Sequence, residues 1–238
     1  MNFPSSPFDQ RRRLLCVVAP TVALAVLGCK ATRDDEESAH GKEEEEEEAE
    51  VTPGEDLMQE HGVVERILLV YAEAERRIAH DEELDPAVVA QTAGLVRRFV
   101  QDYHEKNEEK HVFPRLRSAG REVELVDTLL LQHERGRQLT NEIMRLSRGR
   151  PTPELAQSLR DFQRMYRPHA AREDTVVFPV FRELLDRDEY RELGEKFEAD
   201  EKQRFGENGF ERNVAEIAAL ERALGIDDLA RFTPPARS

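Results

Sequence analysis

The sequence predicts an all-α protein, an up-and-down four-helix bundle with a C-terminal helical extension. Its 238 residues include no tryptophan and only 12 glycines, and 36% are charged, a composition that favours helices over a sandwich or barrel. From about residue 55 onward, apolar side chains recur at steps of three and four residues, as on one face of a helix. The periodic segments are roughly 20 to 25 residues long with short connections, which is typical of antiparallel bundles.

Residues 1–28 have the pattern of an export signal. Three arginines at 11–13 precede an apolar stretch over residues 14–27, which is shorter than the roughly 20 residues that span a bilayer. The stretch ends in the letters VLGC at Cys29, which resemble the lipobox of bacterial lipoproteins. This resemblance implies removal of the signal, lipid attachment at Cys29, and a membrane-anchored protein of the bacterial cell envelope, outside the cytoplasm. An uncleaved anchor is the alternative, and the arginines leave Sec and twin-arginine export both open.

Residues 29–54 are expected to form a disordered acidic tether. The stretch Asp34–Glu50 contains eleven acidic residues and one lysine, so it holds −10 of the total formal charge of −15. Charges this dense repel one another, and no apolar face compensates for the entropy lost on ordering. Weak cation buffering by these carboxylates is the alternative. The overall negative charge argues against a nucleic-acid partner, because binding to phosphates needs a basic face.

Residues 55–183 should contain the four helices of the bundle. Capping residues, prolines and glycines place them at about residues 55–79, 86–113, 121–147 and from 153 onward. Asp85 and Thr152 each stand before a proline, as N-caps do, and Phe113-Pro114 is expected to end the second helix. Residues 184–238 should then add one or two amphipathic helices, interrupted by Gly206 and Gly209, and a tail.

The inner stripes of the four helices are not purely apolar. Each carries a histidine, and two carry a glutamate four residues later, on the same helix face. The six residues are His61, His104, Glu108, His133, His169 and Glu173. Burying such groups without partners would cost about 1–3 kcal/mol each, and a metal centre removes that cost. The stripes therefore predict a metal site in the core, with a purely structural polar layer as the alternative.

An internal repeat supports the metal interpretation. The segment from His104 to Pro114 matches the segment from His169 to Pro179 in its histidine, its glutamate and a final Val-Phe-Pro, with every position displaced by 65. His61 and His133 precede the two copies at a displacement of 72. Packing does not require histidine and glutamate at matching core positions. Two helix pairs would therefore form a site with pseudo-two-fold symmetry.

This ordered spacing resembles the hemerythrin-like, or HHE cation-binding, family, over about residues 57–181. The resemblance implies a non-haem di-iron centre, with Glu108 and Glu173 bridging the irons and the four histidines as terminal ligands. Nitrogen and oxygen ligands also suit manganese, and six side chains leave open positions on two six-coordinate ions. Oxygen carriers of the family typically have five histidines and one aspartate, whereas four histidines with two glutamates resemble the branch associated with nitric oxide and iron-centre repair.

Two further residues are possible additional ligands or outer-shell groups. His111 lies seven residues after His104 on the same face, so a fifth ligand and a buried or rim histidine are both open. Glu65 lies one turn from His61 and could orient that ligand or simply face solvent.

Three functions follow from these patterns. The first is a module that binds a small diatomic, oxygen or nitric oxide, for sensing or scavenging at the cell envelope. The second is an enzyme that reduces nitric oxide or peroxide, or an iron donor for iron-centre repair. The third is a metal-free structural lipoprotein. A ferritin-like oxidase is disfavoured because that class uses Glu-x-x-His repeats, whereas this sequence has His-x-x-x-Glu.

Overall fold

The structure is a computed structural model that describes residues 51–236. A compact unit begins at Thr52, and every regular element from there to residue 236 is a helix. The expected export signal, Cys29 and nearly all of the acidic tether lie outside the described residues. Within the described part, no helix is both long and apolar enough to cross a membrane.

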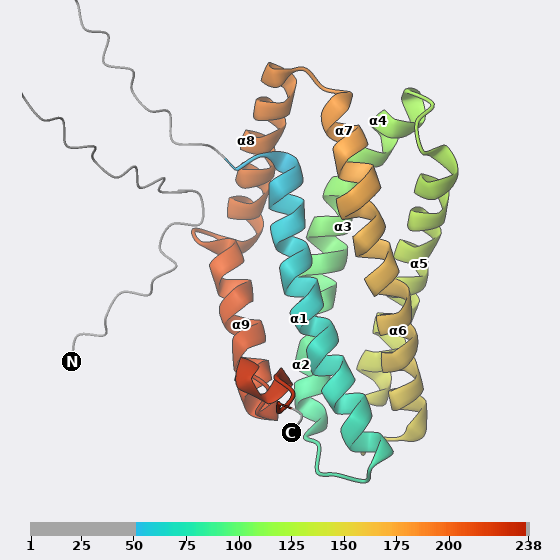
Figure 1. Ribbon diagram of the computed structural model, residues 1–238, viewed down its shortest axis with the longest axis vertical. Coiled ribbons are helices and arrows are strands. Elements are labelled where there is room, and N and C mark those ends of the chain that lie inside the picture. The colour runs from blue at the N-terminus through green and yellow to red at the C-terminus, as the bar shows by residue number, and fades with distance from the viewer. Residues whose placement is uncertain (1–50, 237–238) are drawn as a thin grey trace, which may run out of the picture. The chain divides into compact units, whose positions relative to one another are not determined.

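Four antiparallel rods form the bundle, as the sequence predicted (Figure 1). The first and third rods are single helices, α1 (Pro53–Ala79) and α5 (Val123–Leu146). The second rod is a continuous run of α2 (Pro86–Leu95), η1 (Val96–His104), α3 (Glu105–Asn107), η2 (Glu108–Val112) and α4 (Phe113–Ser118). The fourth rod is α6 (Pro153–Arg172), η3 (Glu173–Val177) and α7 (Phe178–Glu183). The segments η1, η2 and η3 are π-helical.

The predicted caps begin the rods. Asp85 accepts a hydrogen bond from the backbone N–H of Ala87 at 2.9 Å, and Thr152 accepts one from Leu155 at 3.3 Å. Thr52 and Glu55 form a capping box at the start of α1. These bonds satisfy backbone donors that have no partner within a first helical turn.

The prediction that Phe113-Pro114 ends the second helix is wrong, because the rod continues to Ser118. Proline inside an α-helix loses one backbone hydrogen bond, and its ring clashes with the carbonyl one turn earlier. Here the π-helical η2 precedes it, and the N–H of Phe113 donates to Glu108 five residues back. The wider turn lets Pro114 stand in the first turn of α4. The second copy of the repeat has the same arrangement, since the π-helical η3 precedes Pro179 of α7.

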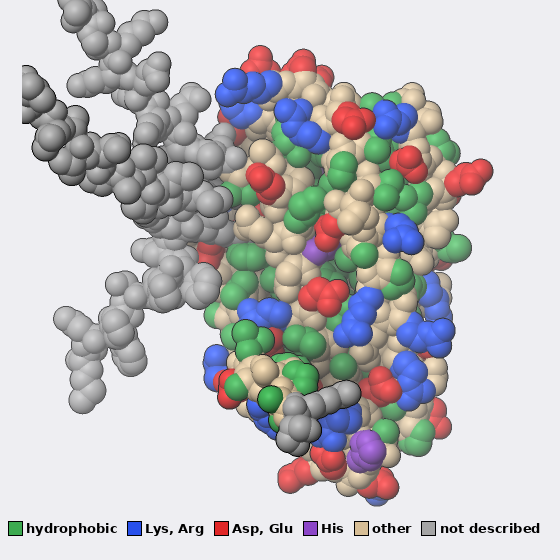
Figure 2. Space-filling view, in the orientation of Figure 1, with side chains coloured by type: hydrophobic (Ala, Val, Ile, Leu, Met, Phe, Trp, Pro, Cys, Tyr) green, Lys and Arg blue, Asp and Glu red, His purple; other side chains and the backbone are tan. Residues whose placement is uncertain are grey.

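A polar layer divides the core into two apolar clusters. One cluster surrounds Ile67, Phe99 and Phe162, and the other surrounds Leu57 and Phe178. Along each rod, the histidine of the inner stripe falls between members of the two clusters. The polar groups are therefore enclosed by apolar packing on both sides, while charged side chains are spread over the outer face seen in Figure 2.

The C-terminal extension forms two helices, α8 (Arg187–Phe205) and α9 (Gly209–Leu224), followed by the short 3₁₀ segment η4 (Leu229–Phe232). Both helices pack beside α1, and α9 also contacts α2 (Figure 1). Phe197 is 1% exposed and belongs to the cluster around Leu57 and Phe178. Ile217 belongs to the cluster around Phe162. The extension thus completes both apolar clusters of the bundle.

Candidate metal centre

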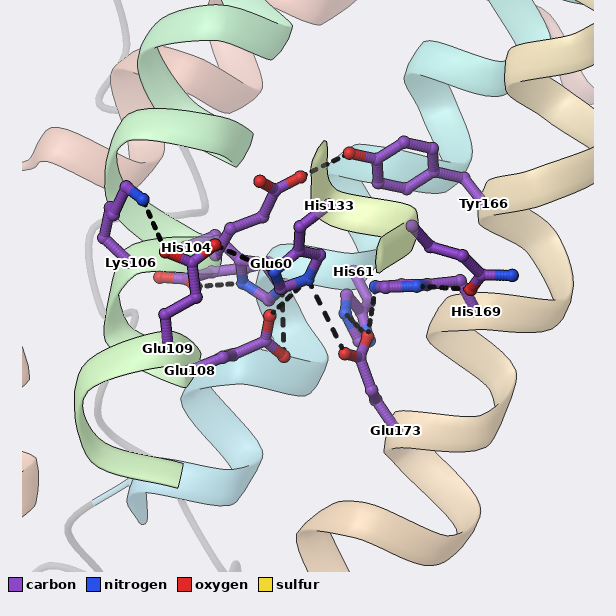
Figure 3. Close-up of polar contacts among 12 residues, drawn as sticks. Glu60, His61, His104, Lys106, Glu108, Glu109, His133, Tyr166, His169 and Glu173 are labelled. Atoms are coloured by element: carbon purple, nitrogen blue, oxygen red, sulfur yellow. Dashed lines mark hydrogen bonds and ion pairs between the residues drawn. The ribbon is translucent and has the colours of Figure 1, made fainter. Parts of the chain in front are cut away.

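The bundle brings the six predicted side chains together at one level of its core (Figure 3). The α1 helix positions His61, and η1 ends at His104; Glu108 and Glu173 open the π-helical η2 and η3. His133 lies on α5 and His169 near the end of α6. None of the six is more than 5% exposed. Two π-helical segments thus begin at the glutamates of the site, in agreement with the frequent placement of π-bulges at functional sites.

The six side chains divide into two groups of potential ligands. In the first half-site, His61 and His104 offer ligand atoms within 4.8 Å of one another and of Glu108 and Glu173. In the second half-site, His133 and His169 do the same with Glu173. The ring centroids are 4.7 Å apart in the first pair of imidazoles and 5.0 Å apart in the second. Glu173 belongs to both half-sites, which is the position of a bridging carboxylate.

Each of the four imidazoles has an outer hydrogen-bond partner on Nδ1, which we call its support. The four bonds are His61 to Asp174 at 2.7 Å, His104 to Glu60 at 2.7 Å, His133 to Glu109 at 3.2 Å, and His169 to Gln132 at 2.9 Å. An ionised carboxylate only accepts, so a carboxylate support fixes the proton on Nδ1. The lone pair of Nε2 then faces inward, toward the glutamates.

The inward-facing atoms fit a metal ion better than they fit one another. Nε2 of His169 lies 3.1 Å and Nε2 of His61 3.4 Å from an oxygen of Glu173, and Nε2 of His133 lies 3.4 Å from Glu108. Among the described residues, all four oxygens of the two glutamates are buried without a hydrogen-bond partner, as is Nε2 of His133. Lone pairs that face each other repel and lose their solvation. Cations between them would relieve both costs.

In the absence of a cation, protons must take this role, and the pKa values show how. Burial opposes charge on His61, but its hydrogen bond to Asp174 and the nearby negative charge of Glu173 outweigh burial and raise the pKa of His61 to about 10. Burial likewise opposes charge on His133, yet the nearby negative charge of Glu108 and the hydrogen bond to Glu109 raise the pKa of His133 to about 10. Metal binding at this site would therefore displace protons.

The pKa values of the two glutamates of the site shift in opposite directions. Burial and the neighbouring charge of Glu173 raise the pKa of Glu108. Burial also acts against ionisation of Glu173, but His169 and His61 hold its pKa well below the usual value. Two carboxylates that share a buried site cannot both ionise without compensating positive charge, which a pair of divalent cations would supply.

A second polar network borders the site. Tyr166 donates a hydrogen bond to the buried Glu105, which also accepts from Arg137 at 2.8 Å. Burial and Glu105 raise the pKa of Tyr166, so the phenol stays protonated. Tyr166 packs over Gly136, where a Cβ atom would lie 2.6 Å from its hydroxyl oxygen. A residue without a side chain at position 136 is therefore required for this placement.

The other predicted candidates lie apart from the centre. His111 is buried against Phe197 of α8, with ring centroids 5.6 Å apart, and belongs to no group of potential ligands in the described chain. Burial lowers its pKa to about 4, so it stays neutral. Glu65 is exposed, which agrees with the solvent-facing alternative.

Sequence reasoning missed all four supports, although the repeat contained the signal. Glu109 and Asp174 each follow a site glutamate at the displacement of 65, and Glu60 and Gln132 each precede a site histidine at the displacement of 72. Polar residues in matching places next to candidate ligands could have been read as their outer-shell partners.

Fold and site together define a four-helix bundle protein whose core carries buried histidine and glutamate groups that could hold metal ions. The hemerythrin HHE cation binding domain matches residues 52–181. The chain belongs to this family, and the resemblance seen in the sequence is confirmed.

Relatives with similar sequences extend beyond the bundle. Uncharacterized proteins of Mycobacterium bovis and Mycobacterium tuberculosis are each 40% identical to this chain over 231 residues, covering 94% of it and 91% of the relative. Because so little of the chain is left out, the match includes most of α8 and α9. No solved structure matches the chain.

Proposed function

We propose that this protein holds a non-haem di-iron centre at His61, His104, Glu108, His133, His169 and Glu173, and binds a small diatomic, oxygen or nitric oxide. The observation that carries the proposal is the enclosed set of four supported imidazoles around two carboxylates that have no hydrogen-bond partner in the described chain. Imidazole and carboxylate ligands suit iron, with manganese as the other metal of matching preference. The bound metal would supply redox chemistry and open coordination positions.

The surroundings of the site suit a small uncharged ligand. The apolar cluster on one side includes Val100, Phe99 and Phe162, each at most 1% exposed. A hydrophobic shell limits access of water to a metal site and influences its redox potential, whereas a diatomic gas has no hydrogen bonds to lose on entering. The supports hold the imidazoles in place without touching the inward side, which leaves that side for the metals and the ligand.

The first test is metal content followed by reaction with gases. The full chain, reconstituted anaerobically with ferrous iron, is expected to retain about two irons, since the ligand atoms form two half-sites. We expect the reduced protein to bind nitric oxide stably and to be oxidised irreversibly by oxygen. Optical spectra recorded through cycles of reduction, gas exposure and purging measure both. Absence of bound iron and manganese would overturn the proposal. A spectrum of the oxygen-bound form that disappears on purging and returns over several cycles would show that the protein carries oxygen reversibly, and not that it scavenges or senses a gas.

We also propose that the domain works at the bacterial cell envelope, anchored through lipid on Cys29. The support is the sequence pattern of residues 1–28 and the acidic stretch that follows it. The wild-type protein should partition into the detergent phase and migrate as a processed form, whereas Cys29→Ser should accumulate as a larger precursor. Equal mobility of the two proteins on a gel would contradict lipid attachment at Cys29.

A further inference from the structure

We propose that the two half-sites are unequal and that Gln132 makes the second one weaker. The metal ion held by His61 and His104 is bound tightly, and the ion held by His133 and His169 is the exchangeable one. This inference rests on the proposed function, because it concerns how the same centre holds its two ions. It depends on the supports, which lie outside the ligand set.

The four supports follow the internal repeat. The support of His61 corresponds to that of His133 at the displacement of 65, and the support of His104 corresponds to that of His169 at the displacement of 72. The first correspondence keeps a carboxylate in both copies. The second one pairs Glu60 with Gln132, so the chemistry of the two halves differs at this position.

An amide supports an imidazole less well than a carboxylate does. A hydrogen bond to a charged acceptor is roughly twice as strong as one between neutral groups, and it makes the imidazole a better electron donor to a metal. The amide of Gln132 can also turn and donate to Nδ1, which would move the proton of His169 to Nε2. The carboxylate of Glu60, when it is ionised, can only accept a hydrogen bond, so it keeps the proton of His104 on Nδ1.

The remaining support of the second half-site is weakened by cations. Glu109 accepts hydrogen bonds from Arg137 and Lys106 as well as facing His133. Its bond to the imidazole, at 3.2 Å, is longer than the 2.7 Å bond from His61 to Asp174. Two positive charges on the same carboxylate reduce the negative charge that it can share with His133.

The first half-site therefore has two carboxylate supports with short bonds, and the second has one shared carboxylate and one amide. Loss of an outer-shell partner typically costs 10- to 100-fold in metal affinity. We therefore expect the two ions to bind with dissociation constants that differ by about 10- to 100-fold. The ion of the second half-site is the first to leave.

Titration of the metal-free full chain with cobalt(II) tests this inference, with calorimetry and visible absorption as readouts. Two separate binding steps are expected. Gln132→Glu should tighten the weaker step by about 10-fold or more and leave the tighter step unchanged. Glu60→Gln should weaken the tighter step by a similar factor, so either variant can decide the matter if the other does not fold. Gln138→Glu, at an exposed position on α5, adds the same charge away from the site and should change neither step.

The outcomes separate the two proposals. Two ions bound with one common affinity, or a Gln132→Glu variant that titrates like the wild type, would overturn the inequality and leave the di-metal centre standing. An equal effect from Gln138→Glu would also overturn it, because the change would then reflect net charge. A wild-type chain that binds no cobalt, iron or manganese would overturn the proposed function and this inference with it.

Discussion

Replacement of Glu173 with glutamine is expected to reduce bound iron from about two ions per chain to less than one. Glu173 is the residue that the two half-sites share. The substitution keeps the shape of the side chain but removes its charge and replaces one of its two oxygens with an NH2 group, which cannot bind a metal ion. One of the two ions therefore loses a ligand atom. Glu108 would then be the only negative group of the ligand set, beside four neutral imidazoles. One negative charge cannot balance two divalent ions at a buried site.

Metal analysis after anaerobic reconstitution measures this loss, and circular dichroism checks that the helices remain. Glu183→Gln is the matched control, because Glu183 lies on α7 in an exposed ion pair with Arg121 at 3.2 Å. That variant should retain the full metal content, since exposed ion pairs contribute little. A Glu173→Gln protein that still binds two ions with wild-type affinity would contradict the bridging role.

Replacement of Phe197 with alanine is expected to lower the free energy of unfolding by about 3–5 kcal/mol. Its ring is 1% exposed and contacts His111 of the second rod, with centroids 5.6 Å apart. Truncation removes apolar burial and leaves a cavity between α8 and the bundle. A change of this size would show that the extension folds as one unit with the four rods.

Urea unfolding of the metal-free protein measures the effect without a contribution from bound metal. Glu192→Ala is the matched control, because Glu192 lies on the exposed side of α8, and we expect a change within about 0.5 kcal/mol. A loss below about 1 kcal/mol for Phe197→Ala, against the 3–5 kcal/mol typical of a buried phenylalanine, would mean that α8 separates from the bundle before the rest unfolds.

The pattern of side chains along the chain was enough to predict the fold class and the six residues of the candidate centre. Both depend on helical periodicity, which places residues such as His104 and Glu108 on one face whatever the rest of the chain does. The caps at Asp85 and Thr152 are also local, since each bonds a backbone group within three residues. The internal repeat also predicted that the two halves of the bundle contribute matching residues to the site, because residues with the same spacing on similar helices occupy equivalent positions in a bundle.

Only the structure showed which residues support the imidazoles. It also showed that π-helical segments precede Pro114 and Pro179 and let both rods continue. Asp174 reaches His61 from another rod, and such a bond depends on the rotation and spacing of two helices, which the period of either helix does not specify.

The position of His111 also depends on the tertiary structure. In an ideal α-helix His111 would lie on the same face as His104, but in the structure its ring packs against Phe197 of α8. His111 lies inside the π-helical η2, where the wider turn changes its angular position from that of an ideal α-helix. The period of the sequence does not show this change, so only the structure separates the fifth candidate histidine from the other four.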